Sequence, residues 1–293
     1  MDVEVFDAAV DAAALLKTVR VADFHQSPKR LAWLRQHGYE GRLVVVGQGG
    51  KPSTIALLER TGSRWHLWKG PAGDAPSAEA LGAILDACSG LSPATLVLDP
   101  QWVYESVLRR AGFHPSLPFA TLLVPTAGDD AQILARMKPG ARSRVRHAAR
   151  AALEFAEEPR RLEEYHAVYA QAMHATRSPD FATLDELRSL SAMAEVHVFV
   201  AVSGGELAAG SICFEHEDAV EARYVATNPA QREVGPMNFL HFETIRWAAA
   251  RGKGWFDLSG WAAGAVDAKE ARINRFKEGF GGIRREYPVF ERD

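Results

Sequence analysis

Two clusters of basic residues could do chemistry, and the larger lies among residues 136–150, where no acidic residue occurs. Its cations are Arg136, Lys138, Arg142, Arg144, Arg146 and Arg150. Because Arg142, Arg146 and Arg150 are four residues apart, a helix would place them on one face. Like charges at this spacing destabilise a helix, and a bound anion relieves the repulsion. The cluster therefore predicts either a solvated helix face or contact with phosphates or an RNA backbone.

The second cluster lies near the carboxyl end, at Lys269, Arg272, Arg275, Lys277, Arg284 and Arg285. It surrounds the sequence Gly-Phe-Gly-Gly at 279–282. Glycines on both sides of Phe280 allow the backbone to approach a ligand closely. Lys277, beside this turn, is suited to neutralise negative charge on an oxyanion or a phosphate. The alternative is a helix end at which the macrodipole favours cations.

A third motif, Arg232-x-x-Gly235, resembles the Q/R-x-x-G-x-G/A loop of GNAT acetyltransferases. That loop opens a helix, and its amides hold the pyrophosphate of an acyl-CoA. Pro236 suits the first turn of such a helix. Met237 stands where the motif has Gly or Ala, so only half of the motif is present.

Other kinds of site are excluded or disfavoured by the sequence. It has no Walker A loop, no G-x-S-x-G elbow and no H-E-x-x-H motif, and its histidines lack carboxylates at metal-ligand spacing. Cys88 and Cys213 are far apart, which excludes a cysteine zinc site and a disulfide-rich scaffold. We expect two buried thiols in a reducing compartment and no metal.

The composition is that of a soluble globular protein. The chain has 293 residues, 47% hydrophobic and 24% charged, and a length that favours two domains. The net charge of −3 excludes a uniformly basic coat for nucleic acid. The amino-terminal residues lack the pattern of a secretory signal, and no apolar run is long enough to span a membrane. These features predict a cytoplasmic protein, either free in the cytoplasm or at the inner face of the membrane. We expect it to be a monomer.

Strand-like and helix-like segments alternate along both halves. In the first half we expect strands at 43–47, 54–58, 65–68, 95–98 and 120–124 and helices at 78–88 and 102–111. In the second half we expect helices at 140–153, 162–176 and 239–250 and strands at 196–202, 206–214, 221–227 and 255–258. The similar content predicts two related α/β domains with mixed sheets, at 1–130 and 131–293, with the last residues packing back on the first domain.

The whole chain resembles the FemABX family of peptidyltransferases, which consist of two GNAT-like domains in tandem. The end signature Phe276–Gly282 is similar to the family's F-K-x-x-F-G-G. Further matching pieces occur in the family's order. They are Gln26-Ser27, Gly70-Pro71, Leu98-Asp99-Pro100, Ala111-Gly112-Phe113, Met137-Lys138, Val145–Ala148, Thr176-Arg177 and Trp255–Gly260.

The resemblance implies transfer of an amino acid from aminoacyl-tRNA to the side-chain amine of a peptidoglycan precursor, as in interpeptide bridge synthesis for cell-wall biogenesis and cell shape. Lys277 would stabilise the tRNA phosphate or the oxyanion, and the Phe276 carbonyl would orient the attacking amine. The residues expected to bind the precursor are Arg177, Phe181, Tyr224 and Asp99, with Phe181 where some relatives have Tyr. The residues expected to contact tRNA or phosphate are Arg142, Arg146, Arg150, Arg275, Arg232 and Gly235.

Two alternatives stay open at this stage. The first is an N-acyltransferase that uses acyl-CoA or an acyl carrier, for which Arg232-x-x-Gly235 speaks and for which acetyl-CoA would be the donor. The second is a non-catalytic RNA-binding or scaffold module that uses the two basic clusters. Under the leading interpretation no cofactor is needed, because aminoacyl-tRNA is a co-substrate.

Overall fold

The computed structural model describes residues 1–7, 14–15, 17–21, 23–74, 76–92, 94–176, 181–262, 264 and 268–293. Its internal contacts divide the chain into two units. Unit 1 comprises Met1–Ala120 and Glu286–Asp293, and unit 2 comprises Thr121–Arg285. From the sequence we expected a boundary between residues 130 and 131, and the internal contacts divide the chain inside strand β7 (His114–Pro125). The boundary falls there because β7, like β13 (Ile283–Arg292), contributes residues to both units.

Unit 1 has a mixed sheet in the order β1-β2-β3-β4-β6-β13, with β5 paired to β3. Its first four strands form an antiparallel meander, β6 runs parallel to β4, and the end of β13 is antiparallel to β6. The strands are β1 (Asp2–Phe6), β2 (Gly41–Gln48), β3 (Lys51–Thr61), β4 (Arg64–Gly70), β5 (Ala72–Gly73) and β6 (Ala94–Leu98). The helices are η1 (Phe24–Gln26), α2 (Pro28–Gln36), α3 (Ala78–Ala87), η2 (Pro100–Trp102) and α4 (Glu105–Arg110).

Unit 2 has the strand order β7-β12-β11-β10-β9-β8. Strands β8 to β11 form an antiparallel meander, and β12 runs parallel to β11. The strands are β8 (Glu154–Glu157), β9 (Val196–Ser203), β10 (Glu206–Glu215), β11 (Ala219–Thr227) and β12 (Trp255–Trp261). The helices are α5 (Asp130–Arg136), α6 (Pro139–Arg150), η3 (Pro159–Arg161), α7 (Leu162–Thr176), α8 (Leu184–Ser191), η4 (Pro229–Val234), α9 (Pro236–Ala250) and α10 (Ala268–Glu278).

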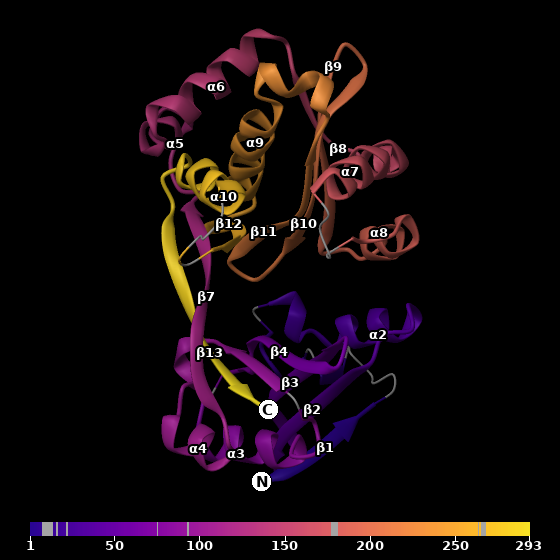
Figure 1. Ribbon diagram of the computed structural model, residues 1–293, viewed down its shortest axis with the longest axis vertical. Helices are drawn as coiled ribbons and strands as arrows, with labels where there is room; N and C mark the ends of the chain where they lie inside the picture. Colours follow the sequence, from indigo (N-terminus) through magenta and orange to yellow (C-terminus); the bar gives the residue numbers. More distant parts are fainter. Residues whose placement is uncertain are drawn as a thin grey trace. The chain divides into compact units, whose positions relative to one another are not determined.

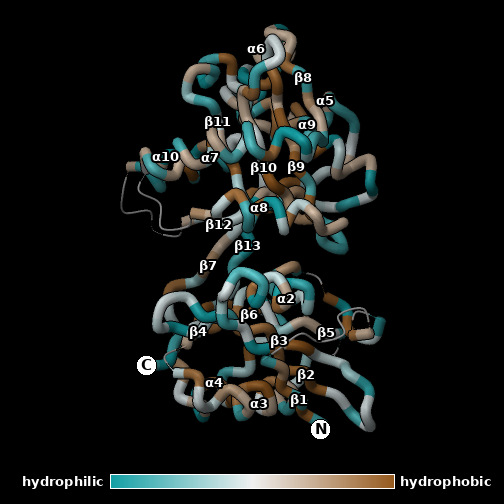
Figure 2. The backbone as a smooth tube through the Cα atoms, turned by 90° about the vertical axis from the view of Figure 1, so that its right-hand side faces the viewer, coloured by the Kyte–Doolittle hydropathy of each residue, from teal (hydrophilic) through white to brown (hydrophobic). Residues whose placement is uncertain are grey.

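Helices cover both faces of the unit 2 sheet, with α6 and α9 on one side and α7 and α8 on the other (Figure 1). Side chains of a strand alternate between faces. Phe199 and Ala201 therefore enter the core with Val145 of α6 and Leu240 of α9. Figure 2 shows apolar residues concentrated on β9 and β10, which are adjacent strands of this sheet. The sheet and α9 thus form a firm base for side chains at the start of α9.

The predicted pattern of elements agrees closely with the structure. Helix α7 has the expected bounds, and each predicted strand of unit 2 is present. The helix expected at 102–111 is shorter, because Asp99 accepts a hydrogen bond from the Gln101 N–H (3.2 Å) and caps the separate turn η2 before α4 begins. Among the described residues, no helix is both long enough and apolar enough to cross a membrane.

Candidate functional site

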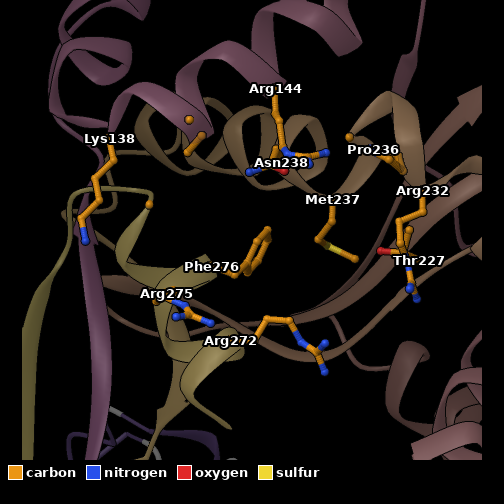
Figure 3. A pocket seen from close by; sticks show the side chains of 14 residues that line it. Lys138, Arg144, Thr227, Arg232, Pro236, Met237, Asn238, Arg272, Arg275 and Phe276 are labelled. Carbon is orange, nitrogen blue, oxygen red and sulfur yellow. The ribbon is translucent and has the colours of Figure 1, made fainter. Parts of the chain in front are cut away.

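A pocket of about 690 Å³ lies in unit 2, where the starts of α6 and α9 meet the end of α10. This volume is in the range of small-molecule and cofactor sites, roughly 300–1,000 Å³. Five of its lining residues are cations, and none is acidic. They are Lys138, Arg144, Arg232, Arg272 and Arg275. In the view of Figure 3 these cations surround the side chains of Met237 and Phe276. The lining thus combines strong positive charge with a small apolar surface, which suits a phosphate-bearing ligand.

Two helix starts add to this charge. Residues from the first turn of α6, including Gly140, and from the first turn of α9, including Asn238, line the pocket. No side chain caps either helix, and each has proline in its first turn. Uncapped amides and the macrodipole make a helix start favourable for anions. Both helices therefore favour negative charge in the same pocket.

Most of the positive charge in the pocket is not neutralised by the protein. Lys138 pairs with Glu278 at 2.9 Å. In the part of the chain that the structure describes, the other four lining cations have no ion-pair partner; they are Arg144, Arg232, Arg272 and Arg275. Grouped cations repel one another, and an anionic ligand removes this repulsion. The pocket therefore favours an anionic ligand, for which about four positive charges are left.

The turn between η4 and α9 depends on Gly235. This residue has φ +74°, a left-handed conformation, and its N–H donates to the Arg232 carbonyl at 3.2 Å. A Cβ at Gly235 would lie 3.3 Å from the Arg144 Cβ, which is a tight contact. Glycine is therefore favoured both by the backbone conformation and by the close approach of α6. The turn fixes Arg232 beside the start of α9.

A second glycine turn ends α10. Gly281 has φ +75°, and a Cβ there would collide with the backbone of Arg136. Phe280, just before it, is fully buried and contacts Phe276 and His241 at ring distances of 5.4 Å each. The Lys138 N–H donates to the Gly279 carbonyl at 2.8 Å, which ties the start of α6 to the same turn. The Gly-Phe-Gly-Gly sequence therefore joins α10, α5 and α6, and its first residue, Gly279, also lines the pocket.

We expect the substitution Gly281→Ala to lower the free energy of unfolding by roughly 2–4 kcal/mol, because the left-handed backbone and the collision with Arg136 both oppose a side chain there. Denaturant unfolding followed by tryptophan fluorescence measures this loss. The control is Gly264→Ala, since Gly264 also has a positive φ but no atom near its position for a Cβ. Equal losses in both variants would show that backbone strain alone matters and that the close approach does not.

Lys277 lies on the side of α10 that faces β12, outside the pocket lining. Its ammonium donates to the Ser259 carbonyl at 3.4 Å and to the Gly260 carbonyl. Burial lowers the pKa of Lys277 to about 8, opposed by the nearby carboxylates of Asp257 and Glu221. An ammonium has three N–H donors, so one is left after these two bonds. The Lys277 ammonium is thus held in place by two carbonyls, and the preceding residue, Phe276, lines the pocket.

His241 is a buried neighbour of Lys277 that the sequence analysis did not single out. Its ring lies 5.4 to 5.9 Å from those of Phe256, Phe276 and Phe280. Burial, together with the charge of Lys277, lowers the pKa of His241 to about 3. His241 is therefore neutral over the physiological range and adds no second positive charge beside the ammonium.

The structure brings together several of the predicted phosphate-binding residues and leaves others outside the pocket. Arg232, Gly235, Arg275 and Phe276 line it. Three of the predicted cations, which lie elsewhere on α6, do not: Arg142, Arg146 and Arg150. Three other cations of the two clusters line the pocket instead. The sequence had not indicated them as site residues; they are Lys138, Arg144 and Arg272.

Two of the predicted precursor-binding residues, Phe181 and Tyr224, do not line this pocket. Phe181 and Tyr224 both contact the buried ring of Tyr169, at 6.0 and 6.1 Å, on the α7 side of the sheet. Asp99 belongs to unit 1, where it caps η2. Arg177 lies outside the described residues. The structure therefore groups two of these four residues around one aromatic ring.

Most of unit 2 is similar to a known family of transferase domains. Residues 135–277 match the model of an acetyltransferase (GNAT) domain. This segment is therefore similar to a GNAT domain and has a GNAT-like fold. The matched range includes the α6 helix, the Arg232–Gly235 turn and Lys277, so both features of the site lie within the GNAT-like segment. The prediction of a GNAT-like transferase is thereby confirmed. No curated protein sequence matches the chain.

Solved structures extend the similarity beyond the GNAT-like segment. FemX is similar at a TM-score of 0.78 and 14% identity, over 99% of this chain and 97% of FemX. The carboxyl-terminal domain of a putative lysylphosphatidylglycerol synthetase from Agrobacterium fabrum has a TM-score of 0.66 at 14% identity, over 96% and 90% of the two chains. A tandem GNAT protein of the clavulanic acid biosynthesis pathway has a TM-score of 0.56 at 12% identity, over 99% and 98%. The predicted FemABX-like fold, with tandem GNAT-like units, is confirmed.

Proposed function

We propose that the chain is an aminoacyltransferase that takes an amino acid from aminoacyl-tRNA and joins it to the side-chain amine of a peptidoglycan precursor. The observation that carries the proposal is the acid-free pocket of the GNAT-like segment, where two uncapped helix starts and five cations converge. The FemX-like fold over the whole chain supports the same function. The choice of a peptidoglycan precursor as the acceptor rests on the sequence motifs that resemble those of the FemABX family.

The extent of the positive charge favours RNA as the donor. The cations come from α6, η4 and α10, and so surround the pocket rather than gather at one point (Figure 3). Successive phosphates of a single strand match such a distribution, and cation–phosphate contacts give RNA binding independent of base identity. The Phe276 ring and the Met237 side chain at the centre of the pocket suit the terminal base of the RNA, because unpaired bases stack on aromatic and apolar side chains.

Met237 disfavours coenzyme A. Its side chain lies inside the pocket, at the position where the GNAT motif has Gly or Ala (Figure 3). In that motif a small residue lets the backbone approach the pyrophosphate. The methionine side chain takes up part of this space, which disfavours a pyrophosphate packed against the first turn of α9.

Transfer needs positioning and charge stabilisation but no covalent enzyme intermediate. The acceptor amine attacks the ester carbonyl carbon, and an oxyanion forms. The carbonyl re-forms as the bond between that carbon and the terminal ribose oxygen breaks, and the proton lost by the amine is taken up by the ribose oxygen, which leaves as a hydroxyl. Lys277 would stabilise the negative charge that develops on the oxygen. The Phe276 carbonyl accepts the Gly279 N–H at 3.1 Å and has a second lone pair with which it would orient the amine.

The test uses the purified chain with pools of charged tRNA and with nucleotide-linked precursor, lipid-linked precursor or phosphatidylglycerol as acceptor. Product mass identifies both the amino acid and the acceptor. We expect a precursor that gains one amino-acid residue, and we expect ribonuclease to abolish the reaction. Transfer to phosphatidylglycerol alone would replace the acceptor, and absence of transfer to every acceptor would overturn the proposal.

The second candidate function is N-acylation from an acyl-CoA, which the Arg232-x-x-Gly235 turn at the start of α9 favours. We expect acetyl-CoA to leave the melting temperature unchanged within error at concentrations at which a charged RNA minihelix raises it by several degrees. Thermal shift in parallel samples measures both. Stabilisation by acetyl-CoA that Gly235→Val abolishes would instead favour the acyl-CoA function.

A further inference from the structure

Ser259 holds an unusual backbone conformation next to Lys277. Its φ is +57°, in the left-handed region, although it is not a glycine. Such a conformation costs of order 1 kcal/mol for a residue with a Cβ and persists where the surroundings fix it. The carbonyls of Ser259 and of the next residue, Gly260, both accept hydrogen bonds from the Lys277 ammonium. The site of Lys277 therefore depends on how Ser259 is held.

Two buried carboxylates hold Ser259. The Ser259 N–H donates to Asp257 Oδ1 at 2.7 Å, and the Ser259 hydroxyl donates to Glu221 Oε1 at 3.1 Å. Glu221 is 0% exposed and Asp257 is 4% exposed. They are direct neighbours across the parallel pair β11 and β12, in which Glu221 is in register with Asp257. Both Ser259 donors are therefore used on fixed acceptors.

Burial of two neighbouring carboxylates is costly unless cations and hydrogen bonds compensate it. His216 lies 3.3 Å from Glu221, and the charge of Lys277 interacts favourably with both acids. The charged and titratable groups around Lys277 are thus Glu221 and Arg223 of β11, Asp257 of β12 and His241 of α9. A buried acid pair retained beside one lysine indicates a role for that pair in placing the lysine.

We propose that Ser259, Glu221 and Asp257 are positioning residues for Lys277. The two carboxylates fix the left-handed conformation of Ser259, and the carbonyls that this conformation presents hold the ammonium in place. The chain thereby uses a serine with two hydrogen bonds where a glycine would adopt the same backbone unaided. The inference rests on the proposed function only in that Lys277 acts during transfer.

The first test compares two substitutions of Ser259. Ser259→Ala removes the hydroxyl but keeps the Cβ, so we expect kcat to fall about tenfold with an unchanged KM for the charged RNA. Ser259→Gly also removes the hydroxyl but favours a positive φ, so we expect it to recover most of kcat. Equal losses in the two variants would show that the hydroxyl itself is needed and would overturn the positioning role.

The second test needs no donor or acceptor. The rate at which a small acylating reagent modifies Lys277, followed by mass spectrometry across pH, reports the titration of that amine. Glu221→Gln removes a charge that raises the pKa of Lys277, so we expect the midpoint to move down by about one pH unit. The matched control is Glu243→Gln on α9, which should leave it in place. An unchanged midpoint in Glu221→Gln would overturn the inference.

The two readouts separate this inference from the proposed function. A shifted midpoint without any transfer activity would leave the three positioning residues as assigned and would refute the aminoacyltransferase function. Transfer activity together with an unchanged midpoint in Glu221→Gln and no recovery in Ser259→Gly would support the aminoacyltransferase function and refute the positioning role of the three residues. If Glu221→Gln does not fold, the Ser259 pair still decides the inference, because both changes are small.

Discussion

Replacing Lys277 by methionine is expected to lower kcat by about 10²–10³-fold, the usual effect of removing one group that stabilises an oxyanion. Methionine keeps most of the side-chain volume but cannot donate to the carbonyls of Ser259 and Gly260. KM for the charged RNA should change little, because Lys277 does not line the pocket. Steady-state transfer measured by product mass gives both constants.

The pH profile gives a further test of the same assignment. If Lys277 stabilises the oxyanion as proposed, its ammonium form is the active one. Because the pKa of Lys277 is about 8, activity should then fall as pH rises through about 8. The control for Lys277→Met is Lys269→Met. Lys269 is an exposed lysine on the same helix, and this variant should retain wild-type kcat. If Lys277→Met keeps most of the activity, Lys277 is not a catalytic residue.

Removing a pocket cation is expected to weaken donor binding rather than slow the chemical step. For Arg275→Ala we expect KM for the charged RNA to rise by about 10- to 150-fold, because a charge-assisted hydrogen bond to phosphate contributes about 1.5–3 kcal/mol. The dependence of binding on salt should become shallower by about 0.7 in log–log slope for each phosphate that the variant no longer neutralises. Fluorescence anisotropy with a labelled minihelix at several salt concentrations measures this slope.

Helix α6 offers a matched pair for this test. Arg144 lines the pocket, whereas Arg146, two residues on, is exposed and lies outside it. Arg144→Ala should therefore weaken RNA binding, and Arg146→Ala should leave it within about twofold of wild type. The opposite order would restore the interpretation in which Arg142, Arg146 and Arg150 form the RNA-binding face.

This pair also shows what the sequence could and could not predict about the site. Charge spacing correctly identified α6 as basic, but charge alone does not say which face turns inward. The apolar residues Ala141, Val145 and Ala148 form the buried stripe of the helix. Arg144 is three residues after Ala141 and four before Ala148, so it borders that stripe. Helical periodicity of the apolar residues was the signal that could have found it.

The fold was more predictable than the site, for physical reasons. Strands β9 and β10 carry apolar alternation around the Gly204-Gly205 turn, a local signal that needs no tertiary contact. The backbone of Ser259 carries no such signal, because only the packed arrangement of Glu221 and Asp257 fixes it. The two helix starts in the pocket likewise come from distant parts of the chain, and their meeting depends on the sheet between them.

Strand β13 has a consequence for how the chain is made. Residues 286–293 supply the strand that pairs with β6, at register positions such as Val289 opposite Val97. A nascent chain emerges from its amino end, so the sheet of unit 1 stays one strand short until after all of unit 2 has been synthesised. The half that begins first is thus the last to be finished, and β6 keeps an open edge throughout translation of the transferase half.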